Sequence, residues 1–259
     1  MSSESHIRMK SDPEFPQPRY SSCSAIRERK PNIAIDGPAG AGKTTIARLA
    51  ARRLGFTYIS TGALYRAITL GLLKRQVDIT EFENSSDQES VLQTMTISVG
   101  YDSGEPRICL DGEDVTDRLS DASVTQWVSE VARIPKVRAC LLDLQRRCAS
   151  SGGVVMDGRD IGSFVLPDAE FKFFLTASVE ERARRRALEL QANGQEVSLE
   201  QVRSIIEKRD RIDSTRSVAP LIKAEDAIEI DTTGKSIEEV LDELLSHVTR
   251  SVHADRGES

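Results

Sequence analysis

The chain has 259 residues, of which 39% are hydrophobic, and a formal net charge of −6 at pH 7. This length suits one α/β domain with a small insertion, and the net negative charge argues against a protein that binds nucleic acid. Because the four cysteines form no C-x-x-C pair and the three histidines lie near the chain ends, we expect neither a zinc site nor a disulfide framework.

The two ends of the chain are expected to be tails. Residues 1–30 contain Ser, Pro, Arg and Glu with few large apolar side chains, which predicts a flexible segment without catalytic residues. Residues 253–259 are expected to be a C-terminal tail, so the folded domain should span residues 31–252. No apolar run approaches the roughly 18 residues of a membrane span, and no apolar signal segment follows the N-terminus. We therefore expect a cytoplasmic protein that does not bind membranes.

A phosphate-binding loop is predicted near the start of the domain. Residues 32–35 form an apolar stretch typical of a strand, residues 43–54 have the pattern of a helix, and between them the sequence matches G-x-x-x-x-G-K-[ST]. Glycines let backbone N–H groups approach a phosphate closely, and the helix N-terminus adds positive potential. The lysine of such a loop reaches the β- and γ-phosphates, and the hydroxyl after it holds Mg²⁺. The predicted phosphate-binding residues are Gly37, Pro38, Ala39, Gly40, Ala41, Gly42, Lys43 and Thr44.

The next segments predict a second strand at residues 56–59 and a helix at residues 62–73. The pattern changes over residues 78–118, where short strands flank a hairpin-like turn. Those strands are expected at residues 94–99 and 107–110. This part of the chain therefore predicts a small β insertion.

Two helices are predicted after the insertion. Apolar side chains recur at helical spacing over residues 124–131 and 137–148, and the two helices should meet near Pro135. Cys140 and Cys148 lie on the apolar stripe of the second helix, so we expect both to be reduced packing residues.

The remaining elements complete an α/β pattern. Residues 154–157 and 171–175 are continuous apolar runs, as expected of strands that helices cover on both faces, and another strand is expected at residues 227–230. Three helix starts carry the capping-box pattern, in which a serine and a residue three positions later cap each other's backbone N–H. The pairs are Ser178 with Glu181, Ser198 with Gln201, and Ser236 with Glu239. We predict an α/β P-loop NTPase fold: a parallel five-stranded sheet with flanking helices.

A phosphate loop alone does not distinguish a kinase from a GTPase or a nucleotide-dependent binding module. A GTPase should carry N-K-x-D, which is absent, and an early D-x-x-G, which the sequence matches only at residues 231–234, beyond the last strand. Separate arginine clusters favour phosphoryl transfer, because such an enzyme must neutralise two anionic substrates. These clusters are Arg66; Arg159; Arg182, Arg185 and Arg186; and Arg209, Arg211 and Arg216. Arg184 and Arg203 fit solvated helix faces better.

Arg159 is the most informative of these arginines. It follows the strand at residues 154–157, and the carboxyl ends of strands form the edge at which open α/β sheets bind ligands. Asp157, at the same edge, is a candidate for the water shell of a magnesium ion.

Four motifs together make the chain similar to the bacterial-type cytidylate kinases, within the nucleoside monophosphate kinases. The motifs are DGPAGAGKTT at residues 36–45, STGALYR at 60–66, DGRD at 157–160 and RSVAPL at 216–221. The resemblance runs over about residues 32–251 and is far more specific than the loop alone. It implies transfer of the γ-phosphoryl group of ATP to CMP or dCMP with Mg²⁺, in pyrimidine nucleotide metabolism.

The resemblance also implies site residues. Catalytic residues would be Lys43, Asp157, Arg159, Arg182 and Arg186. The ATP site would add Thr45 and Arg185 to the loop, and magnesium would be held by Thr44 and, through water, by Asp157. Residues facing CMP would be Thr61, Arg66, Ser129, Arg138, Arg159, Asp160, Arg209, Asp213 and Arg216. Within this set, Ser129, Arg138 and Asp160 would read the cytosine ring.

The family further implies that residues 62–150 form an NMP-binding insertion and that residues 178–195 form a short lid. Two alternatives stay open from the sequence: a P-loop kinase for another small acceptor, and a binding module whose N-terminal tail engages a partner. Small-molecule substrates and a monomer are expected.

Overall fold

Five strands form one parallel sheet in the computed structural model, which describes residues 29–192, 194 and 196–254. Their order across the sheet is β2-β6-β1-β7-β8, and every neighbouring pair is parallel, which confirms the predicted sheet. The strands are β1 (Ile33–Asp36), β2 (Thr57–Ser60), β6 (Val154–Asp157), β7 (Phe171–Thr176) and β8 (Ile228–Asp231). Most of the two predicted tails, residues 1–28 and 255–259, lies outside the described residues.

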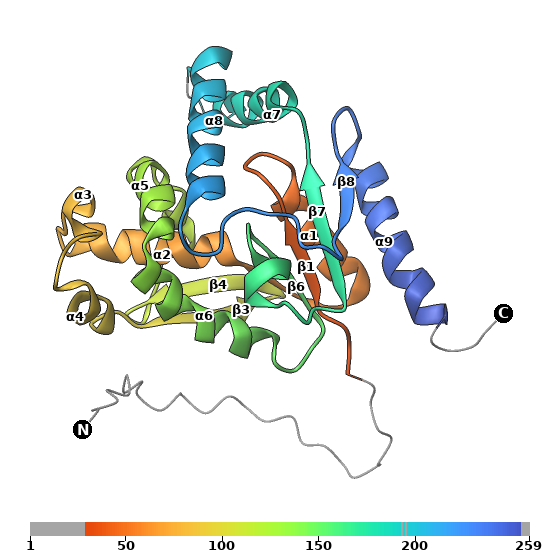
Figure 1. Ribbon diagram of the computed structural model, residues 1–259, viewed down its shortest axis with the longest axis horizontal. Helices are drawn as coiled ribbons and strands as arrows, with labels where there is room; N and C mark the ends of the chain where they lie inside the picture. Colours follow the sequence, from red (N-terminus) through yellow and green to blue (C-terminus); the bar gives the residue numbers. More distant parts are fainter. Residues whose placement is uncertain (1–28, 193, 195, 255–259) are drawn as a thin grey trace, which may run out of the picture.

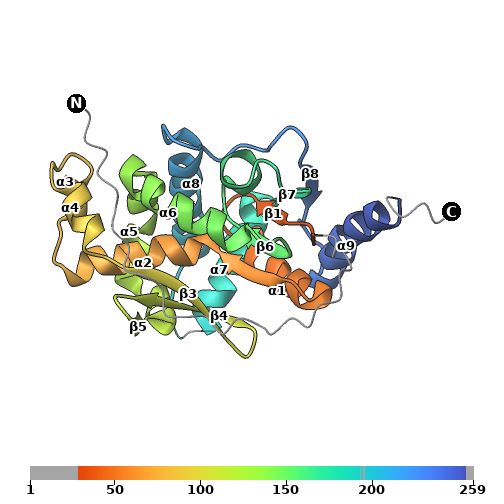
Figure 2. The ribbon, with the colours of Figure 1, turned by 90° about the horizontal axis from the view of Figure 1, so that it is seen from below.

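Helices cover both faces of this sheet (Figures 1 and 2). Helices α1 (Lys43–Leu54) and α9 (Ile237–Ala254) pack together on one face, and α9 runs two residues past the predicted domain end. Helix α6 (Pro135–Ala149) and the short π-helix η2 (Ile161–Val165) pack on the other. Strands β1 and β6 are buried at every position, which explains their continuous apolar sequences. Among the described helices, none is long and apolar enough to cross a membrane.

A second, antiparallel sheet forms where the sequence predicts the β insertion. Strand β3 (Ile97–Asp102) pairs with β4 (Glu105–Leu110), which pairs with β5 (Glu113–Asp114). Both predicted strands are confirmed, but β3 lies further along the chain than expected, because the tight turn is made by Ser103 and Gly104, both at positive φ. The sequence did not predict β5 or the short helices α3 (Ile79–Phe82), α4 (Gln88–Gln93) and η1 (Thr116–Ser120).

Helices α2 (Thr61–Lys74) and α5 (Ala122–Arg133) join the insertion to the domain. They pack against each other, and an apolar core separate from that of the five-stranded sheet fills the space between them and the second sheet. Ile134 has an extended backbone (φ −68°, ψ 120°), so α5 ends there, and Pro135 opens α6. The predicted break between these two helices is confirmed.

The cysteines of α6 differ in their surroundings. Cys148 is half-buried against the cluster that includes η2, but Cys140 is exposed. The buried face of α6 carries Val137, Leu141 and Gln145. Adjacent helical residues point about 100° apart, which turns Cys140 away from that face. The prediction that both cysteines are packing residues is therefore wrong for Cys140.

Two of the three predicted capping boxes are complete. These are Ser198 with Gln201 ahead of α8 (Leu199–Thr215), and Ser236 with Glu239 ahead of α9. Ahead of α7 (Val179–Ala192), Ser178 accepts the Glu181 N–H, but the Glu181 carboxylate binds Arg184 and Arg185. The third prediction is thus only half right, because charged partners on the next turn compete for the carboxylate.

The turn from β1 into the phosphate loop depends on Gly37. Its φ is +142°, and a Cβ there would lie 1.9 Å from the backbone oxygen of Leu175 on β7. The neighbour is the backbone of a central strand, which cannot move aside. Gly104, in the β3–β4 turn, also has positive φ (+84°), but no described atom lies within 4 Å of its hypothetical Cβ.

We expect Gly37→Ala to reduce the free energy of unfolding by about 3 kcal/mol, because it adds a steric overlap to the backbone strain. Gly104→Ala, the matched control, carries the strain alone and should cost about 1 kcal/mol. Urea denaturation of both variants measures the difference. Equal losses would show that the contact with Leu175 does not restrict the loop.

Candidate active site

The phosphate loop lies between β1 and α1 at the carboxyl edge of the sheet, as predicted (Figure 1). Gly40 and Gly42 have φ of +80° and +85°, so the loop uses backbone conformations that glycine adopts without strain. Lys43 is only 5% exposed, and its Nζ donates to the Pro38 carbonyl at 2.7 Å. Burial, reinforced by nearby Arg159, lowers the pKa of Lys43 well below its usual value. An anion beside Lys43 would offset both effects.

Asp157, at the end of β6, accepts hydrogen bonds from two hydroxyls. Thr44 Oγ1 donates to Oδ2 and the Tyr58 hydroxyl donates to Oδ1, each at 2.8 Å. The two predicted magnesium residues are therefore adjacent, and hydroxyl and carboxylate oxygens suit Mg²⁺. Among the described residues, no three or more His, Cys, Asp or Glu side chains are grouped so that they could hold a metal ion.

Arg159 and Asp213 connect the loop after β6 to helix α8. Arg159 Nε donates to Asp213 Oδ2 at 2.7 Å. Burial alone would raise the pKa of Asp213, but Arg159 and Arg209 outweigh it and hold that pKa below its usual value. Burial lowers the pKa of Arg209 to about 10, and its Nε has no hydrogen-bond partner among the described residues. Such an unpaired buried donor costs about 1–3 kcal/mol, which an anionic ligand would offset.

Arg66 and Arg186 bring further positive charge to this place. Arg66 Nη1 donates to Thr125 Oγ1 on α5 at 2.8 Å and to a carbonyl of η1. Burial, then Arg186 and Arg159, lowers the pKa of Arg66. Arg186 is paired with Glu189 at 2.7 Å. We call the gathered side chains the cationic cluster: Lys43, Arg66, Arg159, Arg186 and Arg209.

A buried group of charges surrounds Asp160. The Asp160 side chain is 5% exposed; Arg216 Nη2 donates to Oδ1 at 2.9 Å, and Arg138 Nη2 donates to Oδ2. The Arg138 guanidinium lies over the Tyr65 ring, 5.5 Å from its centroid. Arg138 Nε has no partner within the part of the chain that the structure describes. The structure therefore brings together three of the residues predicted to contact CMP.

Two other predicted CMP residues have contacts that do not test their role. Ser129 is half-buried on α5, one turn after Thr125, the partner of Arg66. Thr61 is buried, and its Oγ1 donates to the Asp157 carbonyl at 2.8 Å, which fixes the start of α2 to the end of β6. The contacts of Ser129 and Thr61 with CMP stay predictions.

Arg182 and Arg185 of α7 contact the region of the phosphate loop. Arg182 is buried and donates from Nη1 to the Ala39 carbonyl at 3.1 Å and to Asp210 Oδ2 at 2.6 Å. These bonds brace the loop against α8, and the predicted catalytic role of Arg182 stays a prediction. Arg185 donates to the Thr232 hydroxyl at 3.0 Å and to the Thr232 carbonyl at 2.6 Å.

The sequence reasoning assigned no role to Asp36, the last residue of β1. It is buried, and its Oδ1 and Oδ2 accept the backbone N–H groups of Ile161 and Gly162, both at 2.7 Å. Burial raises the pKa of Asp36 to about 6, although the two N–H donors oppose the shift. Asp36 thus joins the strand that leads into the phosphate loop to the segment that follows Asp160.

We expect Asp36→Asn to change how stability depends on pH. Between pH 3.8 and about 6 the unfolded chain has released the Asp36 proton and the folded chain retains it, so stability falls as pH rises. The loss is about 3 kcal/mol in full, and asparagine removes it. Urea unfolding at about pH 4 and about pH 7 should show the variant gaining most of this amount relative to wild type.

Asp78→Asn provides a control of opposite sign. Asp78 is exposed, and its hydrogen bonds with the Thr80 side chain and N–H lower its pKa. Its carboxylate therefore stabilises the fold at pH values above its usual pKa. Asp78→Asn should become less stable relative to wild type as pH rises. If the difference in free energy of unfolding between Asp36→Asn and wild type were the same at both pH values, the raised pKa of Asp36 would be contradicted.

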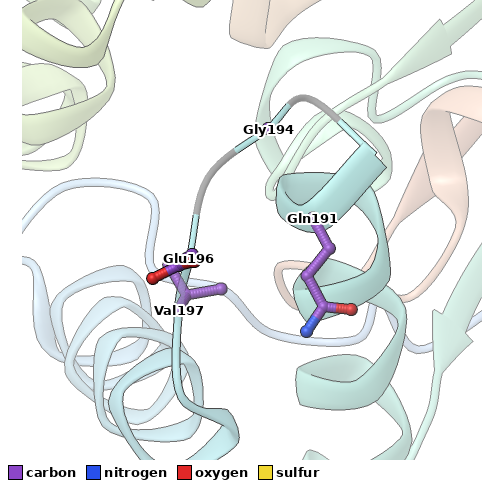
Figure 3. A pocket seen from close by; sticks show the side chains of 4 residues that line it. All are labelled: Gln191, Gly194, Glu196 and Val197. Carbon is purple, nitrogen blue, oxygen red and sulfur yellow. The ribbon is translucent and has the colours of Figure 1, made fainter.

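A pocket at the turn between α7 and α8 lies elsewhere (Figure 3). It is lined by Gln191, Gly194, Glu196 and Val197, none of which is a predicted site residue. Gln191 comes nine residues after Arg182, about 13 Å along the helix from the bond with the phosphate loop. This pocket is not part of the candidate active site.

The fold and the site define a class of protein. A parallel sheet carries a phosphate loop at its carboxyl edge, a threonine and an aspartate suited to Mg²⁺ lie beside the loop, and the cationic cluster adjoins both. Charge neutralisation of this kind is what phosphoryl transfer requires. These features are those of a P-loop kinase.

Comparison with known proteins identifies the family. The cytidylate kinase family model matches residues 33–250. A cytidylate kinase of Pelotomaculum thermopropionicum is 50% identical over 220 residues, which are 85% of this chain and 96% of that protein. One of Desulfitobacterium hafniense is 51% identical over 214 residues, 83% of this chain and 90% of that protein. A bifunctional pantoate ligase/cytidylate kinase of Synechococcus sp. is 50% identical over 223 residues, 86% of this chain and 41% of that protein.

The chain belongs to the cytidylate kinase family. It is a nucleoside monophosphate kinase that transfers the γ-phosphoryl group of ATP to CMP or dCMP, giving ADP and CDP or dCDP. The resemblance found in the sequence is thereby confirmed. Family membership decides against the GTPase, against a kinase for another kind of acceptor and against a binding module without enzymatic activity.

Proposed function

We propose that the cationic cluster is the place of phosphoryl transfer, with ATP on the side of the phosphate loop and CMP on the side of α2 and α8. The observation that carries this proposal is the gathering of buried positive groups: Lys43 is buried near Arg159 and Arg209, and the Nε of Arg209 has no hydrogen-bond partner among the described residues. The phosphates of two substrates would compensate that charge. Catalysis would then come from positioning and from stabilisation of the negative charge on the transferred group.

ATP would be held by the loop and its flanks. The backbone N–H groups of residues 37–45, all but that of Pro38, which has none, would surround the phosphates, and Lys43 would leave the Pro38 carbonyl to reach the β- and γ-oxygens. Arg185 would contact ATP next to the loop. Its Nη1 lies 3.9 Å from the position that a Cβ on Gly42 would take, and this closeness to the loop supports the assignment.

CMP would be bound by phosphate, sugar and base contacts from separate elements. Arg66 and Arg159 would bind its phosphate, and Arg209, Asp213 and Arg216 would contact its sugar and phosphate. Ser129, Arg138 and Asp160 would read the ring, and Thr61 would face the nucleotide. Cytosine offers an amino donor where uracil offers a carbonyl, so a buried carboxylate would distinguish the two bases. Each buried polar group that the wrong base leaves without a partner would cost about 1–3 kcal/mol of binding free energy.

Thr44 and Asp157 would hold magnesium, Asp157 through water, and the adjacency of their side chains supports this assignment. When bound, the ion supplies positive charge to the phosphate oxygens during transfer. Tyr58 would keep the Asp157 carboxylate oriented through its hydrogen bond to Oδ1.

The proposal includes a lid over residues 178–195 and an NMP-binding insertion over residues 62–150. Arg182, Arg185 and Arg186 all lie on α7, and the contact of Arg182 with the loop supports its place beside the phosphates. A lid that excludes water would prevent hydrolysis of ATP, because water competes with CMP for the phosphoryl group.

We also propose that the enzyme is a cytoplasmic monomer without a nucleic-acid partner. Its two substrates are free nucleotides, and the cationic groups described above are assigned to them rather than to a polyanion. Sedimentation equilibrium would test the oligomeric state, and cell fractionation would test the location.

One experiment tests the proposed function directly. ADP release is measured with CMP, dCMP, UMP and AMP as acceptors at matched concentrations. We expect the cytidine nucleotides to be preferred, and the size of the CMP to dCMP ratio to report the sugar contacts. Equal rates with all four acceptors would overturn the assignment of the base-reading residues.

A further inference from the structure

Asp36 is placed where the two halves of the active site meet. It ends β1, and Gly37 opens the phosphate loop directly after it. Its carboxylate points the other way, to the N–H groups of Ile161 and Gly162 at the start of η2. Those N–H groups belong to the first turn of a short helix, where no carbonyl of the same helix can accept them. Asp36 therefore caps η2 from 125 and 126 positions away in the sequence.

The capped segment carries two residues of the proposed CMP site. Gly158 N–H donates to the Ile35 carbonyl at 3.0 Å, so β1 holds the chain before Arg159, and Asp36 holds it after Asp160. The side chains of Arg159 and Asp160 are thus presented from a short stretch fixed at both ends.

Nothing else in the described surroundings of these two N–H groups replaces the carboxylate. No backbone carbonyl is bonded to the Ile161 or Gly162 N–H within the described chain, and a Cβ on Gly158 would lie 2.6 Å from the Ile161 side chain. The segment is therefore tightly packed on one side and depends on Asp36 on the other. The charged groups that act on Asp36 are Asp160 and Lys43.

We propose that Asp36 is a positioning residue for the acceptor nucleotide: it fixes Arg159 and Asp160 by capping η2, and so sets CMP affinity and base choice. This inference rests on the proposed function of those two residues. It differs from a purely structural role, because it predicts an effect on CMP that ATP binding does not share.

Asp36→Asn is the variant that tests this idea. Asparagine has the same size, but its NH₂ group must face one of the two N–H donors, so one bond is lost and two donors oppose each other. The segment between Gly158 and Ile161 should shift. Displacements of about 1 Å at an active site can cost about 100-fold. We expect KM for CMP to rise about tenfold or more, KM for ATP to change less than about twofold, and the CMP/UMP ratio of kcat/KM to fall.

Glu239→Gln is the matched control, since the Glu239 carboxylate also accepts a backbone N–H, that of Ser236 ahead of α9, but among the described residues it contacts none of the proposed site. It should leave every kinetic constant unchanged. Equal increases in both KM values for Asp36→Asn, or no change in either, would overturn the proposal. If Asp160→Asn alters base choice and Asp36→Asn does not, the positioning role fails and the proposed function stands. If Asp160→Asn leaves base choice unchanged, the proposed function itself fails.

A second measurement on the wild-type enzyme does not depend on folding of the variant. Amide hydrogen exchange by NMR should show the N–H groups of Ile161 and Gly162 protected as strongly as that of Gly158, which donates to Ile35. Exchange as fast as that of an exposed loop amide would show that the carboxylate does not hold the segment, and would overturn the inference.

Discussion

Lys43→Met is expected to lower kcat by about three orders of magnitude while the protein stays folded. In the proposed site, the lysine would supply positive charge at the place where the phosphoryl group gains negative charge in the transition state. Methionine keeps much of the apolar stem and removes the ammonium group. Because burial already lowers the pKa of Lys43, the fold gains little from that charge, and the thermal midpoint should change by only a few degrees.

Steady-state rates at saturating ATP and CMP, with the thermal midpoint measured alongside, test this prediction. Lys223→Met is the matched control, because Lys223 is exposed and pairs with Glu229 at 2.9 Å, away from the cluster. It should leave kcat within about twofold of wild type, as expected of a surface ion pair. A Lys43→Met enzyme with kcat within tenfold of wild type would show that Lys43 does not stabilise the transferred group.

The five-stranded sheet was predictable from the sequence because its strands are buried on both faces. Such strands read as continuous apolar runs, and β1 and β6 show no exposed position at all. The insertion was harder to predict. Strand β3 has no buried position and mixes half-buried with exposed residues without regular alternation, and its position depends on a turn made by Ser103, a residue type with no strong preference for positive φ.

The arrangement of the candidate site was predictable where one local motif carries the residues. The phosphate loop and the segment from Asp157 to Asp160 each bring several candidate site residues from neighbouring positions. Residues that act through contacts distant in the sequence were missed. Asp36 accepts a backbone N–H at the start of η2, the Tyr58 hydroxyl donates to Asp157, and Thr232 accepts a hydrogen bond from Arg185. Their signal lies in the pairing of strands that are far apart in the chain. An acid that ends a buried strand directly before a phosphate loop is the one local hint that could have singled out Asp36.

Asp160→Asn is expected to lower the preference for CMP over UMP by about ten- to a hundredfold in kcat/KM. A carboxylate can only accept hydrogen bonds, so it suits the amino group of cytosine and repels the carbonyl that uracil carries at the same position. Asparagine can donate as well as accept, which removes that repulsion. Most of the change should come from slower reaction with CMP, and reaction with UMP should be unchanged or faster.

Asp213→Asn separates base reading from general damage to the charge network. Both acids are buried, and both contact Arg216, but only Asp160 is assigned to the ring. Asp213→Asn should therefore slow CMP and UMP alike and keep their ratio within about twofold. Losing one partner of a buried ion pair costs about 3–5 kcal/mol, so urea unfolding must show that each variant is folded in the assay. If both variants lowered the ratio equally, selectivity would belong to the arginines that the two acids orient, and Asp160 would not read the base itself.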